Sequence, residues 1–405
     1  MKKLVQITLG IVAGIGGFLE VGSIASAAEA GASFRYALIW AIALGTICLI
    51  FLMEMTGRLA AISKHGVAGA VRERFGFPFA ILPCVAQLIV NLLVVASEIG
   101  GVALALMFVT GIEVRVWVIP VTLLIWLAMW AGTLNFLENG TAILGLVSVA
   151  FVVAAVKMHP DYHAVLRSLL PSSPRQDVAH YWYIAVGIVG STISPYMFHF
   201  YGSGAIEDEW GEDSLGANRV SAGLGMSFGA VMSVAVLVCA ALVLSPRNIE
   251  VARYEQVALI LIPALGRWGL PLLAATLGVC CFGAATEVSL SSAYMVAQTL
   301  GWNWGENAKP ARNARFAFTY TIMLLLGGSF VMIGVDPLKL TMFAMAITAV
   351  VMPLVVLPFI VLLNDKTYVH EHTNGPVGNA IVVLTILLAA VVAIVTIPLE
   401  IIGGG

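Results

Sequence analysis

Charged side chains are scarce in this sequence of 405 residues. Only 10% of the residues are Asp, Glu, Lys or Arg, whereas 60% are hydrophobic. A soluble domain carries about 25% charged residues, so the composition excludes an ordinary soluble protein. The formal net charge of −2 and the lack of a basic cluster also exclude a nucleic-acid partner. The sequence therefore predicts an all-α integral membrane protein whose surroundings are the lipid bilayer.

Cysteine is also rare. The five cysteines lie in or beside apolar runs without the spacing of a metal site, at Cys48, Cys84, Cys239, Cys280 and Cys281. We interpret them as small buried hydrophobic residues that form no disulfides. We expect the protein to have no cofactor and not to be an enzyme.

Long apolar runs are abundant. A bilayer-spanning helix needs about 20 apolar residues. Eleven such spans are predicted, at residues 5–31, 36–57, 79–109, 114–132, 140–157, 180–203, 219–244, 269–299, 315–334, 341–363 and 377–401. Only the connections 158–179 and 245–268 are long, and neither can hold a soluble domain. We therefore expect a single transmembrane domain over residues 1–405.

Basic residues gather in the connection after the second predicted span, which holds Arg58, Lys64, Arg72 and Arg74. Short connections rich in Lys and Arg stay in the cytoplasm, so this cluster predicts a cytoplasmic N-terminus and an outward C-terminus. The first apolar run resembles a signal peptide, but it is too long and contains Glu20, so we expect it to be retained. The expected location is a bacterial inner membrane.

Two predicted spans are interrupted. The first contains Glu20-Val21-Gly22-Ser23, and the sixth contains Ser194-Pro195 after several small residues. The two breaks are about 175 residues, or five spans, apart, which is typical of transporters built from inverted repeats with the substrate site between the broken helices. This predicts repeats over 5–157 and 180–363, with an extra helix at 377–401.

The breaks contain the residues that we expect to bind a substrate. Glu20 is a carboxylate deep in a span, which is costly and therefore a functional hypothesis, with a structural acid bonded to unwound backbone as the alternative. Ser23 could add a hydroxyl group, although serine is common in helix packing. Ser191 and Ser194 precede Pro195, which lacks a backbone donor and frees carbonyl groups in the preceding turn.

Other polar residues within spans are candidates for a proton path or a pocket lining. Glu98, Glu54 and His199 are predicted to carry protons, with pairing to a basic residue as the alternative for Glu54. The predicted pocket lining consists of Tyr196, Phe198, Tyr201 and Glu287. For the aromatic residues and His199, simple packing is an equal alternative.

These motifs also resemble a known family. Glu20-Val21-Gly22-Ser23 followed by Ala30-Gly31-Ala32 is similar to Asp-Pro-Gly-Asn followed by Ala-Gly-Ala, and Ser194-Pro195-Tyr196-Met197 is similar in position to Met-Pro-His-Asn. Arg72-Glu73-Arg74-Phe75 and Glu98 also match. The chain thus resembles a divergent member of the NRAMP family of divalent metal transporters, which implies a LeuT-type fold with broken helices 1 and 6.

The resemblance implies a metal site at Glu20, Ser23, Ser194 and the carbonyl group of Ser191. The family's thioether ligand is replaced by Ser194, and the remaining oxygen ligands suit hard ions such as Mg²⁺ or Mn²⁺. The chain therefore resembles the NRAMP-related magnesium transporter branch. Met197 is a candidate for a displaced sulfur ligand, with packing as the alternative. Proton coupling stays open, because Tyr196 and Tyr201 replace the family's histidines.

Our main hypothesis is a secondary transporter that moves a hard divalent cation by alternating access, with protons as a further partner. One alternative is a transporter of a small organic cation, for which Glu20 supplies the counter-charge and Tyr196, Phe198 and Phe200 an aromatic lining. Another alternative is a sensor on the same scaffold that does not transport.

Overall fold

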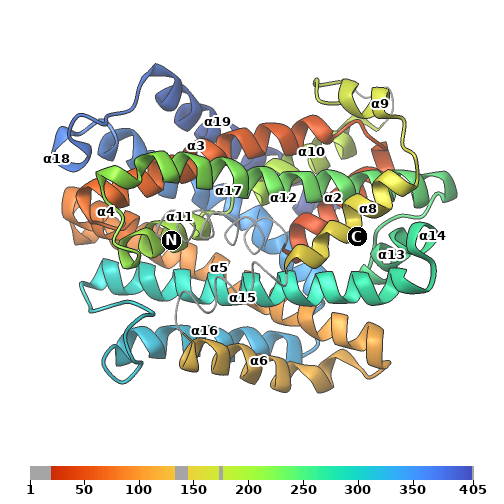
Figure 1. The fold of residues 1–405 in the computed structure, drawn as a ribbon, viewed down its shortest axis with the longest axis horizontal. Coiled ribbons are helices and arrows are strands. Elements are labelled where there is room, and N and C mark those ends of the chain that lie inside the picture. The colour runs from red at the N-terminus through yellow and green to blue at the C-terminus, as the bar shows by residue number, and fades with distance from the viewer. Residues whose placement is uncertain (1–19, 133–144, 173–176, 404–405) are drawn as a thin grey trace.

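The computed structural model describes residues 20–132, 145–172 and 177–403, and this part of the chain contains helices and no strands (Figure 1). The helices are α2 (Val21–Phe34), α3 (Ile39–Ser63), α4 (Val67–Phe75), α5 (Phe77–Thr110), α6 (Val114–Ala131), α8 (Val149–Lys157), α9 (Tyr162–Arg167), α10 (Val178–Thr192), α11 (Tyr196–Glu207), α12 (Leu215–Val243), α13 (Tyr254–Val257), α14 (Ile262–Leu265), α15 (Gly269–Leu300), α16 (Ala314–Met332), α17 (Pro337–Leu362), α18 (Lys366–Val369) and α19 (Pro376–Gly403). Short 3-10 turns link several of them.

The predicted spans correspond to these helices in order. In the described residues, seven helices or runs of continuous helices are long and apolar enough to cross a membrane. The sixth predicted span consists of two helices, α10 and α11, which separate at the predicted break. The described part of the first span is α2, and residues 5–19 lie outside the described residues, as do residues 140–144 of the fifth.

The long connection at 245–268 differs from its predicted role as a simple loop. It contains the short helices α13 and α14, and Tyr254, Val257 and Leu261 within it are buried. The hydroxyl group of Tyr254 donates a hydrogen bond to the carbonyl oxygen of Val21 at the start of α2. The connection therefore supports the first helix break.

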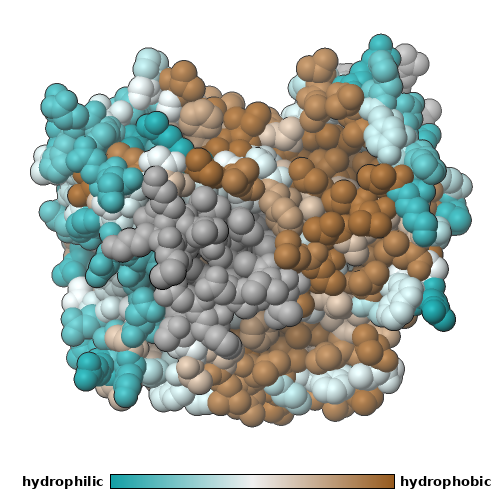
Figure 2. All heavy atoms as spheres, in the orientation of Figure 1, coloured by the Kyte–Doolittle hydropathy of each residue, from teal (hydrophilic) through white to brown (hydrophobic). Residues whose placement is uncertain are grey.

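Apolar side chains cover the middle of one face of the molecule. Figure 2 shows brown side chains between hydrophilic surfaces at the left and right edges of this face. On α6 the exposed side chains include Val116, Ile119, Leu123, Leu124 and Leu127. This pattern is that of a lipid-facing surface, with the long helices crossing the membrane along the horizontal axis of Figure 1.

Small residues bring helices close together in the interior. A Cβ atom added to Gly31 of α2 would collide with the carbonyl oxygen of Leu237 in α12, and one added to Gly101 of α5 would lie 2.5 Å from the sulfur of Cys281. Such contacts through small residues are how membrane helices gain packing energy. The five cysteines are buried and free, as predicted.

Candidate functional site

At the first predicted break, Glu20 lies immediately before α2. Its backbone is extended (φ −96°, ψ 172°), so the helix begins at Val21. The Ser23 hydroxyl accepts a hydrogen bond from the Glu20 amide at 3.1 Å. This contact satisfies one of the amide groups that a helix start leaves without an intrahelical partner. Ser23 therefore shapes the break, and it does not line the cavity described below.

The second break spans residues 193–195. In a continuous helix the amide of residue 195 would bond the carbonyl oxygen of Ser191, but Pro195 has no N–H group. The Ser194 hydroxyl donates to this carbonyl oxygen instead, at 3.1 Å. The sequence thus ends α10 at Thr192 and keeps a polar turn at membrane depth, where it must be satisfied by protein or by a cavity.

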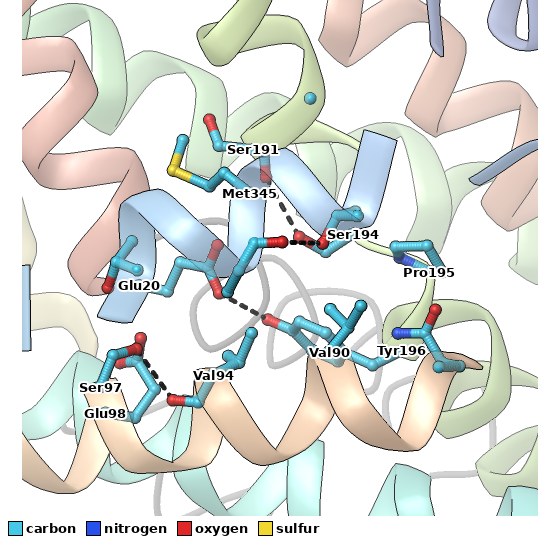
Figure 3. Close-up of a pocket in the computed structure, with 15 residues that line it drawn as sticks. Glu20, Val90, Val94, Ser97, Glu98, Ser191, Ser194, Pro195, Tyr196 and Met345 are labelled. Carbon is cyan, nitrogen blue, oxygen red and sulfur yellow. Dashed lines mark hydrogen bonds between the residues drawn. The ribbon is translucent and has the colours of Figure 1, made fainter. Parts of the chain in front are cut away.

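A narrow cavity of about 20 Å³, which we call the central cavity, lies between the two predicted breaks (Figure 3). It is lined from α2 by Glu20, from α5 by Gln87, Val90, Val94, Ser97 and Glu98, from α10, α11 and their break by Gly190, Ser191, Ser194, Pro195 and Tyr196, and from α17 by Thr341, Ala344, Met345 and Thr348. The structure therefore brings together five residues that the sequence predicted for the site, namely Glu20, Glu98, Ser191, Ser194 and Tyr196.

Two buried carboxylates occupy this cavity with specific partners. The Tyr196 hydroxyl donates to Oε2 of Glu20 at 3.4 Å. The carboxylate of Glu98 accepts from the amide of Val21, with Oε1 at 3.1 Å and Oε2 at 3.4 Å. Glu98 thus reaches from α5 to the start of α2, where the helix dipole favours negative charge. Ser291 of α15 fixes Tyr196 by donating to its carbonyl oxygen at 2.7 Å.

Several predicted residues lie away from the central cavity. Met197 and His199 are buried in α11, and neither is among the lining residues. Phe198 packs on Phe359 with ring centroids 5.6 Å apart. Tyr201 donates a hydrogen bond to Oδ1 of Asn218 at 2.9 Å. The side of α11 that carries these residues therefore packs against other helices.

The acids Glu54 and Glu287 also lie outside this lining. Glu54 forms an ion pair with Arg58 at 3.1 Å, and Arg219 lies 3.8 Å away. Arg58 also donates to Oδ1 of Asn374 at 2.7 Å. Glu54 is thus held in a network that ties α3 to the segment before α19, while Glu287 is buried in α15.

The residues of α17 that line the central cavity were not predicted from the sequence. Thr341, Met345 and Thr348 line the cavity at spacings of four and three residues, which places them on one face of the helix. The sequence feature that could have indicated this contribution is the pair of hydroxyl residues on one face of an apolar span. Gln87 of α5, whose Nε2 donates to Asn91 at 2.7 Å, was also missed.

The central cavity has the donor chemistry of a cation site. In the described residues no group of three or more His, Cys, Asp or Glu side chains could hold a metal ion. Two carboxylates, hydroxyl groups and the carbonyl end of α10 surround the cavity instead. A divalent ion in such a site keeps part of its water shell, as Mg²⁺ usually does in proteins.

A second group of acids lies beyond the membrane-spanning segments, where α11 meets the connection between α15 and α16. Glu207 accepts hydrogen bonds from the amides of Glu306 at 2.8 Å and Asn307 at 2.9 Å, and also from the Tyr294 hydroxyl. Burial, and then the charge of Glu207, raises the pKa of Glu306 to about 9. Burial, and then Glu207, raises the pKa of Asp208 to about 6.

The same architecture occurs in solved transporters. The crystal structure of a manganese transporter from Eremococcus coleocola matches with a TM-score of 0.81 at 16% identity, covering 98% of this chain and 86% of that chain. The structure of MhsT in complex with L-phenylalanine matches with a TM-score of 0.65 at 15% identity, covering 96% and 98%. The fold is therefore that of the LeuT-type membrane transporters, as predicted.

The sequence comparison identifies the family. Residues 10–398 match the model of the natural resistance-associated macrophage protein-like (Nramp) family. The chain belongs to the Nramp family of membrane metal transporters and is not an enzyme. The divalent metal cation transporter MntH of Aeromonas hydrophila is 23% identical over 396 residues, covering 94% of this chain and 92% of that relative. The resemblance to the magnesium branch stays a prediction.

Proposed function

We propose that this protein is a secondary transporter that moves a divalent metal cation across the membrane by alternating access. The observation that carries this proposal is the central cavity, where Glu20 and Glu98 supply two carboxylates between the helix breaks. Carboxylate, hydroxyl, carbonyl oxygen and water are ligands of hard divalent ions. We propose Mn²⁺ and Mg²⁺ as the cargo, held partly hydrated. The metal transporters among the relatives and structural neighbours support a metal substrate.

An organic cation is less well supported as the substrate. Recognition of such a cation uses aromatic faces around the charge. Of the aromatic lining predicted for an organic cation, only Tyr196 borders the central cavity. Phe198 packs on Phe359, and Phe200 is buried outside the lining. The geometry therefore favours a metal ion over an organic cation.

Metal uptake by proteoliposomes tests the proposal. We expect saturable uptake of Mn²⁺ or Mg²⁺ by the wild-type protein and its loss in Glu20→Gln, which keeps the size of the side chain and removes its charge. Glu113→Gln is a matched control, because this carboxylate is 73% exposed at the start of α6. Absence of saturable flux in the wild-type protein would contradict the proposal and leave the sensor alternative. Wild-type uptake by Glu20→Gln would contradict the assignment of the substrate site to Glu20.

We further propose that protons accompany the metal and that Glu98 is the group that carries them. Glu98 borders the central cavity together with Glu20, so it senses the charge of a bound cation. The other two predicted carriers are less well placed. Glu54 is paired with Arg58, and His199 is buried away from the cavity.

We also propose that the N-terminus is cytoplasmic and that the membrane is a bacterial inner membrane. One end of the molecule gathers the basic residues of α3 and α4, and the Arg74 contact to Asp365 at 3.1 Å places α18 at the same end. The native cysteines are buried. A cysteine introduced at Gly375 should therefore resist an impermeant thiol reagent in intact cells and react in inverted vesicles. The reverse pattern would contradict this orientation.

A further inference from the structure

A second cavity, which we call the outer cavity, adjoins the central cavity. It measures about 30 Å³ and shares Gly190 and Met345 with the central cavity. It also shares Glu29 with a hollow of about 940 Å³ that lies beside α10 and residues 248–252. The three spaces thus follow one another from the surface to the central cavity.

The outer cavity has an unpartnered carboxylate. Glu29 of α2 lies partly buried in it and makes no hydrogen bond or ion pair with any residue in the described part of the chain. A carboxylate within a membrane-spanning helix is costly and marks a functional site by default. Within residues 20–132, 145–172 and 177–403 this group has no stabilising partner, whereas a bound cation would supply one.

Two methionine residues line the same cavity from another helix. Met342 and Met345 are one turn apart on α17, so they lie on one face, and both line the outer cavity. Ser26 and Glu29 are likewise one turn apart on α2. Figure 3 shows Met345 at the edge of the central cavity, on the same side as Ser191. One acidic and two methionine residues therefore line one space.

The wall formed by α10 leaves room for a ligand. A Cβ atom added to Gly187, which lines the outer cavity, would meet no atom within 4 Å. Glycine at this helical position therefore keeps open the space that a larger side chain would fill.

We propose that Glu29, Met342 and Met345 form a second metal site, between the surface hollow and the central cavity, that prefers Mn²⁺ and softer divalent ions to Mg²⁺ and Ca²⁺. The carboxylate attracts any divalent cation, whereas thioether sulfur favours transition metals over hard ions. This inference rests on the proposed function, because the site gains its purpose from a metal that continues to the central cavity. The sulfur ligand that the sixth span lacks is thus supplied by α17, on the access route.

Equilibrium binding of Cd²⁺ to the purified full-length protein tests the second site. Cd²⁺ is a soft probe that binds both carboxylate and thioether groups. We expect the wild-type protein to bind a second Cd²⁺ ion that the double variant Glu29→Gln, Met342→Leu loses. Met342 lines only the outer cavity, and Met to Leu nearly conserves volume, so the fold should be kept. Met332→Leu, at an exposed methionine of α16, is the matched control.

The outcomes separate this inference from the proposed function. Glu20→Gln should remove the central ion and leave the outer one, and Mg²⁺ should fail to displace the outer ion. Unchanged Cd²⁺ binding in the Glu29→Gln, Met342→Leu variant, or equal competition by Mg²⁺, would overturn the second site. Absence of saturable metal uptake by the wild-type protein would instead overturn the proposed transport function. Size-exclusion profiles that match wild type confirm that each variant is folded.

Discussion

Glu306 lies in the connection between α15 and α16. Only 7% of its surface is exposed, and it lies beside Glu207. Because its pKa is raised from 4.5 to about 9, the folded protein keeps a proton there that the unfolded chain releases. This contribution to stability is present below pH 4.5 and is lost as the pH rises toward 9.

We therefore expect Glu306→Gln to raise the melting temperature at pH 8 and to weaken its dependence on pH, because glutamine is neutral throughout. Thermal unfolding in detergent between about pH 5 and 9 measures both effects. Glu371→Gln, at an exposed position, should leave the pH dependence unchanged. Parallel curves for wild type and Glu306→Gln would contradict the expectation.

Individual site residues were predictable when their chemistry was unusual for a membrane span. Glu20 and Glu98 stood out as acids in apolar runs, and Ser194 stood out beside a proline. The hydroxyl groups of Thr341 and Thr348 did not, because such groups commonly bond the carbonyl oxygen four residues before, as both do here. Their contact with the central cavity depends on how α17 packs.

The helix α2 depends at its first residue on a side chain from another helix. The amide of Val21 donates to Glu98, and this contact is buried. Glu98→Ala should leave the amide without an acceptor and lower the free energy of unfolding by about 1 to 2 kcal/mol. Glu98→Gln keeps an acceptor oxygen, so its loss should be smaller.

Denaturant unfolding in mixed micelles compares the two variants. Gln87→Ala offers a control at the same cavity, because its partner Asn91 keeps a second contact with Ser292 at 2.9 Å. Equal losses for Glu98→Ala and Glu98→Gln would show that the charge of Glu98, and not its role as an acceptor, stabilises the start of α2.

At the scale of elements, the described spans, the start of α2 and the break between α10 and α11 were predictable, because apolar length and proline act locally along the chain. The short helices α13 and α14 were not. The helix α14 packs on α15, and α13 packs on α2, where Tyr254 also bonds Val21; these are tertiary contacts between distant segments. A connection of mixed polarity does not reveal such contacts.

Transport by the whole molecule should move protons with the metal. A ligand must be deprotonated to bind a metal ion, so binding at Glu20 and Glu98 releases protons near the central cavity. We expect the lumen of proteoliposomes to acidify during Mn²⁺ uptake, as measured with a trapped pH-sensitive dye. Glu98→Gln should reduce the acidification, whereas Glu113→Gln should retain it. An unchanged luminal pH in wild type would exclude coupled proton movement.

The class of the whole molecule followed from composition, and its fold from the five-span separation of the breaks. The repeat boundaries at 5–157 and 180–363 stay a prediction. The course of the access route could not be predicted, because it depends on Glu29, Gly187 and Met345 meeting from three helices. Of these three residues, only Glu29 is an unusual residue type for an apolar segment.

The contact between Gly31 and Leu237 has a mechanical consequence. Where two helices touch through backbone atoms, neither can slide or tilt without the other, because there is no side chain between them to change rotamer. We therefore expect α2 and α12 to move as one rigid body, held together at Gly31, with Glu20 at the opposite end of α2. In a cycle that tilts α2, we expect α12 to swing with it, so the protein has fewer independent moving bodies than helices.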